Sequence, residues 1–306
     1  MSSAAATYIG TSGWSYPKGD GTWKGYFYPG GKINELEYYS QYFNTVEINS
    51  SFYRPPSPGY VYNWARRVPR GFLFSVKLWQ KFTHPKMYRE ATGEEAIIDQ
   101  SDIDLFQKCL EPLMKYDKLG ALLAQFPPSF KNDAYGRQVL GAIARAFNEC
   151  RIAVELRHRS WSDDPGTAKL LGENHLAWVQ IDEPRFSSSV AVEVPVTADI
   201  SYFRFHGRNA KEWWTGDAET RYRYLYSEDE IAGLAERVKT AAEKTKLLFA
   251  FFNNHWQAYA PRNANDLKKA LRMPAAQIPL PFQEMPVNLE FTQAKSDIKN
   301  KKGTGK

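Results

Sequence analysis

The chain alternates short apolar runs with segments of helical periodicity, and it does so along most of its length. Most of the apolar runs are followed by a segment with apolar residues three to four positions apart. The runs lie at 7–14, at the start of 45–54, and at 72–78, 119–126, 152–156, 177–181, 201–205 and 247–252. Eight such repeats predict a single-domain α/β fold, the (β/α)₈ barrel. The runs are apolar throughout, as expected for parallel strands covered on both faces.

A doubly wound open sheet is the alternative architecture. No Gly-x-Gly-x-x-Gly sequence opens the first predicted helix, which favours the barrel. Ser227 and Glu230 form the pattern of a capping box and predict a helix start. We expect a long connection without helices over 79–99, and irregular or extended chain over 186–200. Cys109 and Cys150 both lie in stretches predicted to be helical.

Composition limits the classes of protein that this chain can belong to. Two cysteines among 306 residues provide no disulfide framework and no paired metal-binding spacing, which indicates a reducing compartment. No run approaches the ~18 apolar residues of a membrane span. The first seven residues lack the pattern of a signal peptide. We therefore predict a cytoplasmic protein without a membrane partner.

The net charge of +6 is concentrated at one end of the chain. Residues 295–306 contain five lysines and one aspartate, which leaves the remaining chain near +2. A uniformly basic nucleic-acid groove is therefore not what raises the isoelectric point. We expect an N-terminal segment at 1–6, the barrel domain at 7–272, and a Pro-rich extension with a disordered, Lys-rich tail at 273–306.

Polar and charged side chains gather where the predicted strands end. In a (β/α)₈ barrel the carboxyl ends of all strands share one face, and active sites lie there. Residues far apart in the sequence would then converge on one pocket. The polar candidates are Glu47, Asn49, Lys77, Gln125, Glu155, Arg157, Asp182, Arg204, His206, Asn253 and Asn254, with His84, Trp14 and Trp161 from the neighbouring loops.

Glu47 and Glu155 are the predicted catalytic pair. Two carboxylates can serve as acid and base, or one of them as a nucleophile. The alternative is a purely structural ionic network with Lys77 and Arg157. We expect Lys77 to contact an anionic group of the substrate rather than to form an imine. Arg157 and Arg204 suit fork-like binding of carboxylate or phosphate, or an internal ion pair.

The remaining candidates have two interpretations each. His206 could carry a proton or hold a structural hydrogen bond. Together with His84, His158, His255 and the acidic residues Glu47, Glu155 and Asp182, it could also contribute to a divalent metal site, although no compact metal motif is present and no metal ligands are assigned. Trp14 and Trp161 could stack on a sugar or base, or simply wall the pocket. Asn253 and Asn254 offer amide groups to a polar ligand or stabilise a turn.

Several ordered motifs resemble one known family. The motifs are Gly10-Thr11-Ser12-Gly13-Trp14, Phe27-Tyr28-Pro29, Val46-Glu47-Ile48-Asn49-Ser50-Ser51-Phe52-Tyr53, Phe74-Ser75-Val76-Lys77, Thr83-His84, Gln125-Phe126-Pro127-Pro128, Glu155-Leu156-Arg157-His158-Arg159-Ser160-Trp161, Arg204-Phe205-His206-Gly207-Arg208 and Phe252-Asn253-Asn254. In these, the chain resembles the YecE-like family, whose domain has no assigned function. The resemblance covers about 7–272 and implies a barrel of the triosephosphate-isomerase type. It implies no reaction.

From the residues at the strand ends we predict an enzyme of hydrolase or lyase type. Its ligand would be a small, polar or anionic molecule of sugar-like or nucleotide-like chemistry. Arg and Lys mixed with aromatic side chains also suit a nucleic-acid-processing or nucleic-acid-binding protein. A barrel that binds a small ligand without catalysis is the third alternative. The sequence does not specify a substrate, a cofactor or an oligomeric state.

Overall fold

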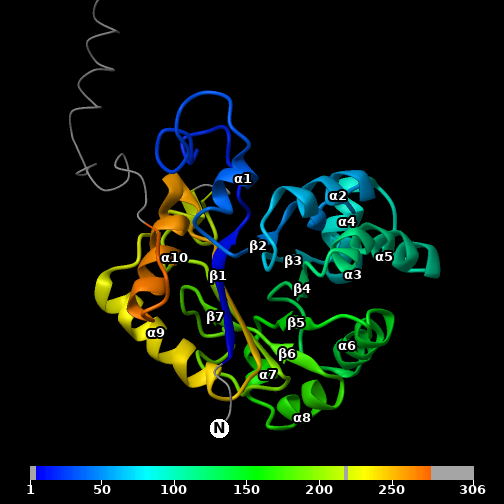
Figure 1. Cartoon of the computed structure of the whole chain (residues 1–306). Helices are drawn as coiled ribbons and strands as arrows, with labels where there is room; N and C mark the ends of the chain where they lie inside the picture. The colour runs from blue at the N-terminus through cyan, green and yellow to red at the C-terminus, as the bar shows by residue number, and fades with distance from the viewer. Residues whose placement is uncertain (1–4, 217–219, 277–306) are drawn as a thin grey trace, which may run out of the picture.

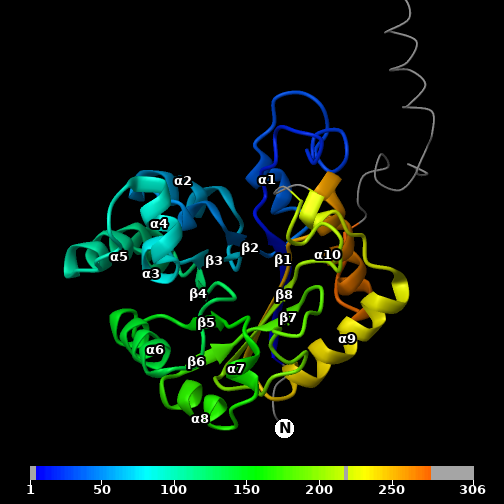
Figure 2. The same cartoon turned by 180° about the vertical axis from the view of Figure 1, so that it is seen from behind.

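In the computed structural model, which describes residues 5–216 and 220–276, the strands form one sheet in the order β6-β5-β4-β3-β2-β1-β9-β8-β7. Every strand pair is parallel, and the helices surround the sheet (Figures 1 and 2). The strands are β1 (Ala6–Ser12), β2 (Thr45–Ile48), β3 (Leu73–Lys77), β4 (Leu119–Gln125), β5 (Ile152–Glu155), β6 (Leu176–Trp178), β7 (Gln180–Asp182), β8 (Ile200–Phe205) and β9 (Leu247–Phe252).

The segments β6 and β7 are two halves of one strand, interrupted at Val179. β6 pairs with β5, where Ala177 lies opposite Ala153, whereas β7 pairs with β8. The Val179 N–H still donates to the Val154 carbonyl, 3.0 Å away. The predicted strand over 177–181 therefore completes the ring between β5 and β8. This arrangement confirms the predicted (β/α)₈ barrel.

The helices are one to four turns long. They are α1 (Glu35–Tyr39), α2 (Pro58–Arg67), α3 (Gln80–Thr83), α4 (Pro85–Thr92), α5 (Gln100–Lys115), α6 (Ala134–Ala146), α7 (Arg159–Ser162), α8 (Gly166–Glu173), α9 (Glu228–Ala242) and α10 (Tyr259–Ala270), with 3₁₀ turns at Ser50–Phe52, Thr220–Tyr222 and Trp256–Ala258. The predicted capping box is confirmed, because Ser227 and Glu230 accept each other's backbone N–H at the start of α9. No helix in these described ranges is long and apolar enough to cross a membrane.

Three local predictions were wrong. The connection over 79–99 contains α3 and α4, which are too short to show a helical period; Pro85 opens α4, and Gly93 ends it in the left-handed conformation. Cys150 lies beyond the end of α6 rather than in a helix. The turn α7 occupies a stretch that we expected to be a loop. The segment 186–199 is irregular, as predicted, with one isolated bridge at Ser189, and Ile200 already begins β8. The Lys-rich tail over 295–306 lies outside the described residues.

The barrel interior changes from apolar to charged along its axis. Near the amino ends of the strands, the ring of Phe249 packs against Tyr8 and Tyr202, with centroids 5.4 and 5.9 Å apart. Side chains alternate between the two faces of a strand, so Tyr202, Arg204 and His206 all point to the same side. The fully buried Tyr202 therefore supports a charged layer directly above it.

Gly10 is the point of closest approach between β1 and β2. A Cβ at this position would clash with the Thr45 carbonyl and lie 2.9 Å from the Tyr39 hydroxyl, which itself donates to that carbonyl. We expect Gly10→Ala to lower the free energy of unfolding by about 1–3 kcal/mol, because the rigid core cannot move aside. Urea unfolding followed by far-UV circular dichroism measures the change.

The matched control is Gly233→Ala within α9. A Cβ there meets nothing within 4 Å, so the substitution should raise the free energy of unfolding by about 0.5–1 kcal/mol through higher helix propensity. Equal stability of the two variants would contradict the close approach at Gly10.

Candidate active site

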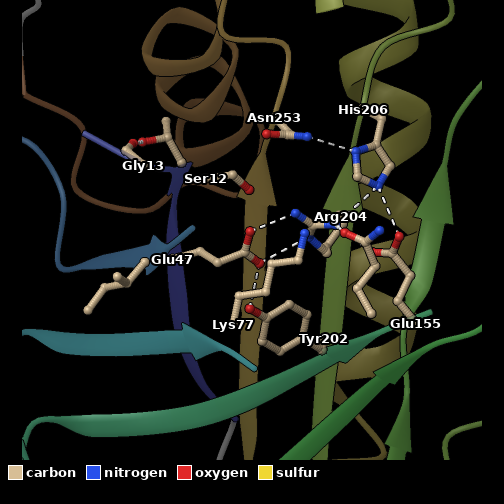
Figure 3. Close-up of polar contacts among 12 residues, drawn as sticks. Ser12, Gly13, Glu47, Lys77, Glu155, Tyr202, Arg204, His206 and Asn253 are labelled. Carbon is tan, nitrogen blue, oxygen red and sulfur yellow. Dashed lines mark hydrogen bonds and ion pairs between the residues drawn. The ribbon is translucent and has the colours of Figure 1, made fainter. Parts of the chain in front are cut away.

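Arg204 lies at the centre of a buried ionic network. Its Nη2 and Nε contact Glu47 Oε1 and Oε2 at 2.7 and 3.0 Å, and its Nη1 contacts Glu155 Oε2 at 2.6 Å (Figure 3). The three side chains come from β8, β2 and β5 and are at most 1% exposed. The hydroxyl of Tyr202 donates a further 2.7 Å hydrogen bond to Glu47. The two candidate carboxylates are thus bridged by one guanidinium.

Glu155 also pairs with a second arginine. Arg157 Nη2 and Nε lie 2.6 and 2.7 Å from Glu155 Oε1, and Arg157 Nη1 lies 3.5 Å from Glu183. Burial alone would raise the pKa of Glu155, but Arg204 and Arg157 hold that pKa well below its usual range. Burial raises the pKa of Glu183. The predicted structural network consisted of two ion pairs. The pair of Arg157 with Glu155 is present, whereas Glu47 pairs with Arg204 and not with Lys77.

His206 lies behind this network and has no exposed surface. Its Nε2 is 3.2 Å from Arg157 Nη2 and 3.6 Å from Glu155 Oε1, and its Nδ1 faces the side-chain amide of Asn253 at 3.1 Å. Burial lowers the pKa of His206 to about 4, against the opposing effect of Glu155. The ring is therefore neutral near pH 7, and its Nε2 can accept a hydrogen bond from the guanidinium.

Lys77 ends β3 and has a different environment. Its Nζ lies 4.0 Å from the centroid of the Phe52 ring, and no carboxylate oxygen of the described chain lies within 4.0 Å of it. Burial, followed by the nearby Arg204 guanidinium, lowers the pKa of Lys77 from 10.5 to about 7. At neutral pH a large fraction of this side chain is an uncharged amine.

A cavity of about 520 Å³ opens over Lys77 and Arg204, and we call it the rim pocket. It lies at the carboxyl ends of the strands, the face on which barrel enzymes place their active sites. Its lining consists of Gly13, Trp14, Ser15, Tyr16, Lys18, Gly21, Asn49, Ser50, Phe52, Tyr53, Lys77, Gln125, Arg204, Tyr222, Asn253 and His255. Six candidates from the sequence are among these residues: Trp14, Asn49, Lys77, Gln125, Arg204 and Asn253.

Five other candidates lie immediately behind or beside the lining. Glu47, Glu155, Arg157 and His206 form the ionic layer beneath the pocket floor, with Arg204 between that layer and the cavity. His84 packs edge-on against Phe52, with ring centroids 4.9 Å apart, and burial lowers its pKa to about 3.

Three further candidates point away from the pocket. Asp182 faces α9 and contacts Arg208 and Arg237 at 2.8 and 3.5 Å. The amide of Asn254 donates to Asn263 in α10.

Trp161 is fully buried in α7, donates to the Phe130 carbonyl and stacks on the Phe130 ring. We therefore assign these three side chains to the frame of the barrel rather than to the pocket.

Strand parity explains most of these positions. Asn253 points into the barrel and its neighbour Asn254 points out; likewise Asp182 points out, and Glu183, which sequence reasoning did not select, points in towards Arg157. The alternation of strand side chains between the two faces can be read from the sequence, and it also places Tyr202 on the same face as Arg204. Tyr16 and Tyr222 were not selected, and His255 was considered only as a possible metal ligand, because all three come from loops whose path has no sequence period.

The described residues contain no group of three or more His, Cys, Asp or Glu side chains that could hold a metal ion. The carboxylates of the site are already engaged by guanidinium groups. The donors that remain towards the pocket include amides, the amines of Lys18 and Lys77, and aromatic hydroxyls, a set suited to a polar organic ligand.

The parallel barrel and the polar pocket at its carboxyl face define a TIM-barrel protein with a site sized for a small molecule. The family described as "Protein of unknown function DUF72" matches residues 8–288, and the chain belongs to this family. It is similar to the YunF protein of Bacillus subtilis, with 27% identity over 280 residues that span 86% of this chain and 94% of that protein.

Two solved structures share the whole barrel. A DUF72 protein of Thermotoga maritima has 35% sequence identity and a TM-score of 0.76 over 87% of this chain and 99% of its own. A DUF72 protein of Enterococcus faecalis has 26% identity and a TM-score of 0.73 over 88% and 99%. These likenesses establish the family and the fold. They do not establish a reaction.

Removing Arg204 would take the guanidinium from the buried Glu47 and leave Glu155 with Arg157 as its counter-charge. We expect Arg204→Met to lower the free energy of unfolding at pH 7 by about 3–5 kcal/mol, the usual cost of breaking a buried ion pair. The control is Arg159→Met, whose pair with Asp163 is more than half exposed and should contribute less than about 1 kcal/mol. Urea unfolding of both variants tests this, and similar losses would argue against a dry ionic core.

The neutral state of His206 predicts an acid-sensitive stability. In the folded protein this ring takes up a proton only near pH 4, whereas in the unfolded chain it does so below about pH 6.5. The unfolded state therefore binds more protons between these values, and stability falls as the pH falls through this window. Relative to His206→Gln, the wild-type free energy of unfolding should drop by up to about 1.4 kcal/mol per pH unit there.

The measurement is a series of urea titrations of both proteins from pH 7.5 to pH 4. Parallel stability curves for the two proteins would show that His206 is not held neutral by the fold.

Proposed function

We propose that this DUF72 protein is an enzyme that binds a small, polar, anionic molecule of sugar-like or nucleotide-like chemistry in the rim pocket and acts on it in a hydrolase-type or lyase-type reaction. The narrower relation to YecE-like proteins is part of the same proposal, because it rests on the motifs alone. The observation that carries the proposal is the charge of the pocket lining.

The rim pocket is lined by cationic side chains and, within the described parts of the chain, by no carboxylate. Lys18, Lys77 and Arg204 all reach its surface. The charge of Arg204 is matched from below by Glu47 and Glu155, whereas among the described residues Lys77 has no anionic partner within 4.0 Å. A phosphate or carboxylate group on a ligand would supply the missing partner, which supports an anionic ligand.

The remaining lining favours a ligand with hydroxyl groups and a flat or ring-shaped part. Asn49, Gln125 and Asn253 present amides, and the buried Oδ1 of Asn49 has no hydrogen-bond partner in the described structure. An unpaired buried acceptor is costly, and a ligand hydroxyl would satisfy it. The rings of Trp14 and Tyr53 provide surfaces on which a sugar or base can stack.

The geometry favours a lyase-type over a hydrolase-type reaction. A carboxyl group that acts as general acid needs a raised pKa, and the pKa of Glu155 is held low by two arginines. Both glutamates are fully buried under Arg204, and neither lines the pocket. We therefore assign Glu47, Glu155 and His206 to positioning Arg204. Lys77 is the group that can exchange a proton with the ligand near pH 7.

Binding of unreactive anions tests the proposal. Ribitol 5-phosphate, glycerol 3-phosphate and AMP carry phosphate and hydroxyl groups but no carbonyl group that could react. We expect at least one of them to bind the wild-type protein in isothermal titration calorimetry, and Lys77→Met to weaken that binding about tenfold or more. A tenfold change corresponds to about 1.4 kcal/mol, a modest value for a charge-assisted contact.

Lys86→Met is the matched control, because the Lys86 side chain is 82% exposed on α4 and does not line the rim pocket. Its affinity should equal that of the wild type. The proposal is abandoned if no probe binds the folded wild-type protein at millimolar concentration, or if Lys77→Met binds as tightly as the wild type.

A further inference from the structure

Lys77 differs from the other lysines that are shielded from solvent. Four lysines among the described residues are buried or half-buried, and the amines of three of them contact oxygen atoms of the protein. Lys118 donates to the carbonyls of Val68 and Pro69 at 2.7 and 2.8 Å, Lys268 donates to the Tyr42 carbonyl at 2.8 Å, and Lys81 pairs with Asp102 at 2.8 Å. The Nζ of Lys77 has no such oxygen and instead faces the Phe52 ring across the pocket floor.

We propose that Lys77 is a nucleophile that forms a covalent imine with an aldehyde or ketone carbonyl of the substrate. This inference rests on the proposed function, and it adds the class of substrate and the reacting atom. It replaces our expectation from the sequence that Lys77 only contacts an anionic group.

The position of Nζ suits this role. It stands at the carboxyl end of a barrel strand, and it lines a cavity of about 520 Å³ that can hold a substrate carbonyl directly over it. A lysine whose task is structural donates to oxygen atoms of the protein, as Lys118 and Lys268 do. An amine that must attack a carbon needs its lone pair free and directed at the ligand.

Burial and the surrounding charges keep the amine uncharged for part of the time. Burial lowers the pKa of Lys77 most, the guanidinium of Arg204 acts in the same direction, and that of Arg157 adds a smaller effect; together they lower the pKa to about 7. Glu47 and Glu155 oppose this effect, but they are bound to the arginines and do not contact Nζ. An ordinary lysine with a pKa near 10.4 is neutral in only about one molecule in 2,500 at pH 7.

The chemical step is balanced without a cofactor. The Nζ lone pair attacks the carbonyl carbon, a C–N bond forms, and the C–O π pair moves to the oxygen. This oxygen receives, through water in the open pocket, the proton that the attacking nitrogen gives up, which yields a neutral carbinolamine. The carbinolamine hydroxyl takes a second proton from solvent and leaves as water while the nitrogen lone pair forms the C=N bond. Nζ ends as a protonated imine, and its positive charge can accept the electron pair of a neighbouring C–H or C–C bond in a lyase-type step.

Reductive trapping tests this assignment. The full-length protein is incubated at pH 7 with D-glyceraldehyde 3-phosphate or dihydroxyacetone phosphate and sodium cyanoborohydride, which reduces an imine to a stable secondary amine. Intact-mass and peptide mass spectrometry locate the adduct. We expect one adduct per chain at Lys77 with at least one of the two probes, formed at least 100-fold faster than at the exposed Lys86. The rate at Lys77 should rise with pH and reach half its maximum near pH 7.

Lys77→Arg should lose this adduct while retaining the positive charge, and Lys86→Arg should keep it. Circular dichroism and urea unfolding confirm that both variants fold. If neither probe labels Lys77 faster than Lys86, the imine is ruled out. Binding of ribitol 5-phosphate, glycerol 3-phosphate or AMP that still depends on Lys77 would then show that the proposed function survives, with Lys77 as an anion contact. Loss of both results would end both proposals.

Discussion

The carboxyl-terminal half of the barrel is organised around one interaction, the pairing of the Arg204 guanidinium with both Glu47 and Glu155. Three charged groups with almost no exposed surface can persist in a protein interior only if their hydrogen bonds are satisfied, since desolvation of unpaired charges is far more costly than that of neutral side chains. Tyr202 from below and Arg157 from the side supply the remaining contacts. The network links β2, β5 and β8, so it also fixes the distance across the barrel.

This network determines what the pocket above it can do. Because both carboxylates form ion pairs with arginines, they influence the electrostatic potential at the pocket floor but do not contact a ligand. Burial of Lys77, followed by the Arg204 guanidinium, lowers the pKa of this side chain to about 7. The network thus contributes both to the rigidity of the floor and to the reactivity assigned to the amine next to it.

The sequence was sufficient to predict the barrel and to bring most site residues to one rim. Strand-helix alternation placed Glu47, Lys77, Glu155 and Arg204 at the ends of parallel strands, and they are neighbours in the structure. The sequence could not show which cation would pair with both glutamates, because that depends on side-chain reach across the barrel. Asp182 and Asn254 were selected as strand-end residues, but each is one position out of phase with the interior face. The short helices α3 and α4 were missed because neither is long enough to display a period.

The charge of the pocket lining also bears on the ionic form in which a ligand can enter. The phosphate group of a metabolite attracts cations in solution, including divalent ions. A cavity whose described walls carry Lys18, Lys77 and Arg204 and no acidic side chain repels such ions at short range. A phosphorylated ligand would therefore enter the pocket without a bound magnesium ion, and lysine and arginine side chains would neutralise its phosphate.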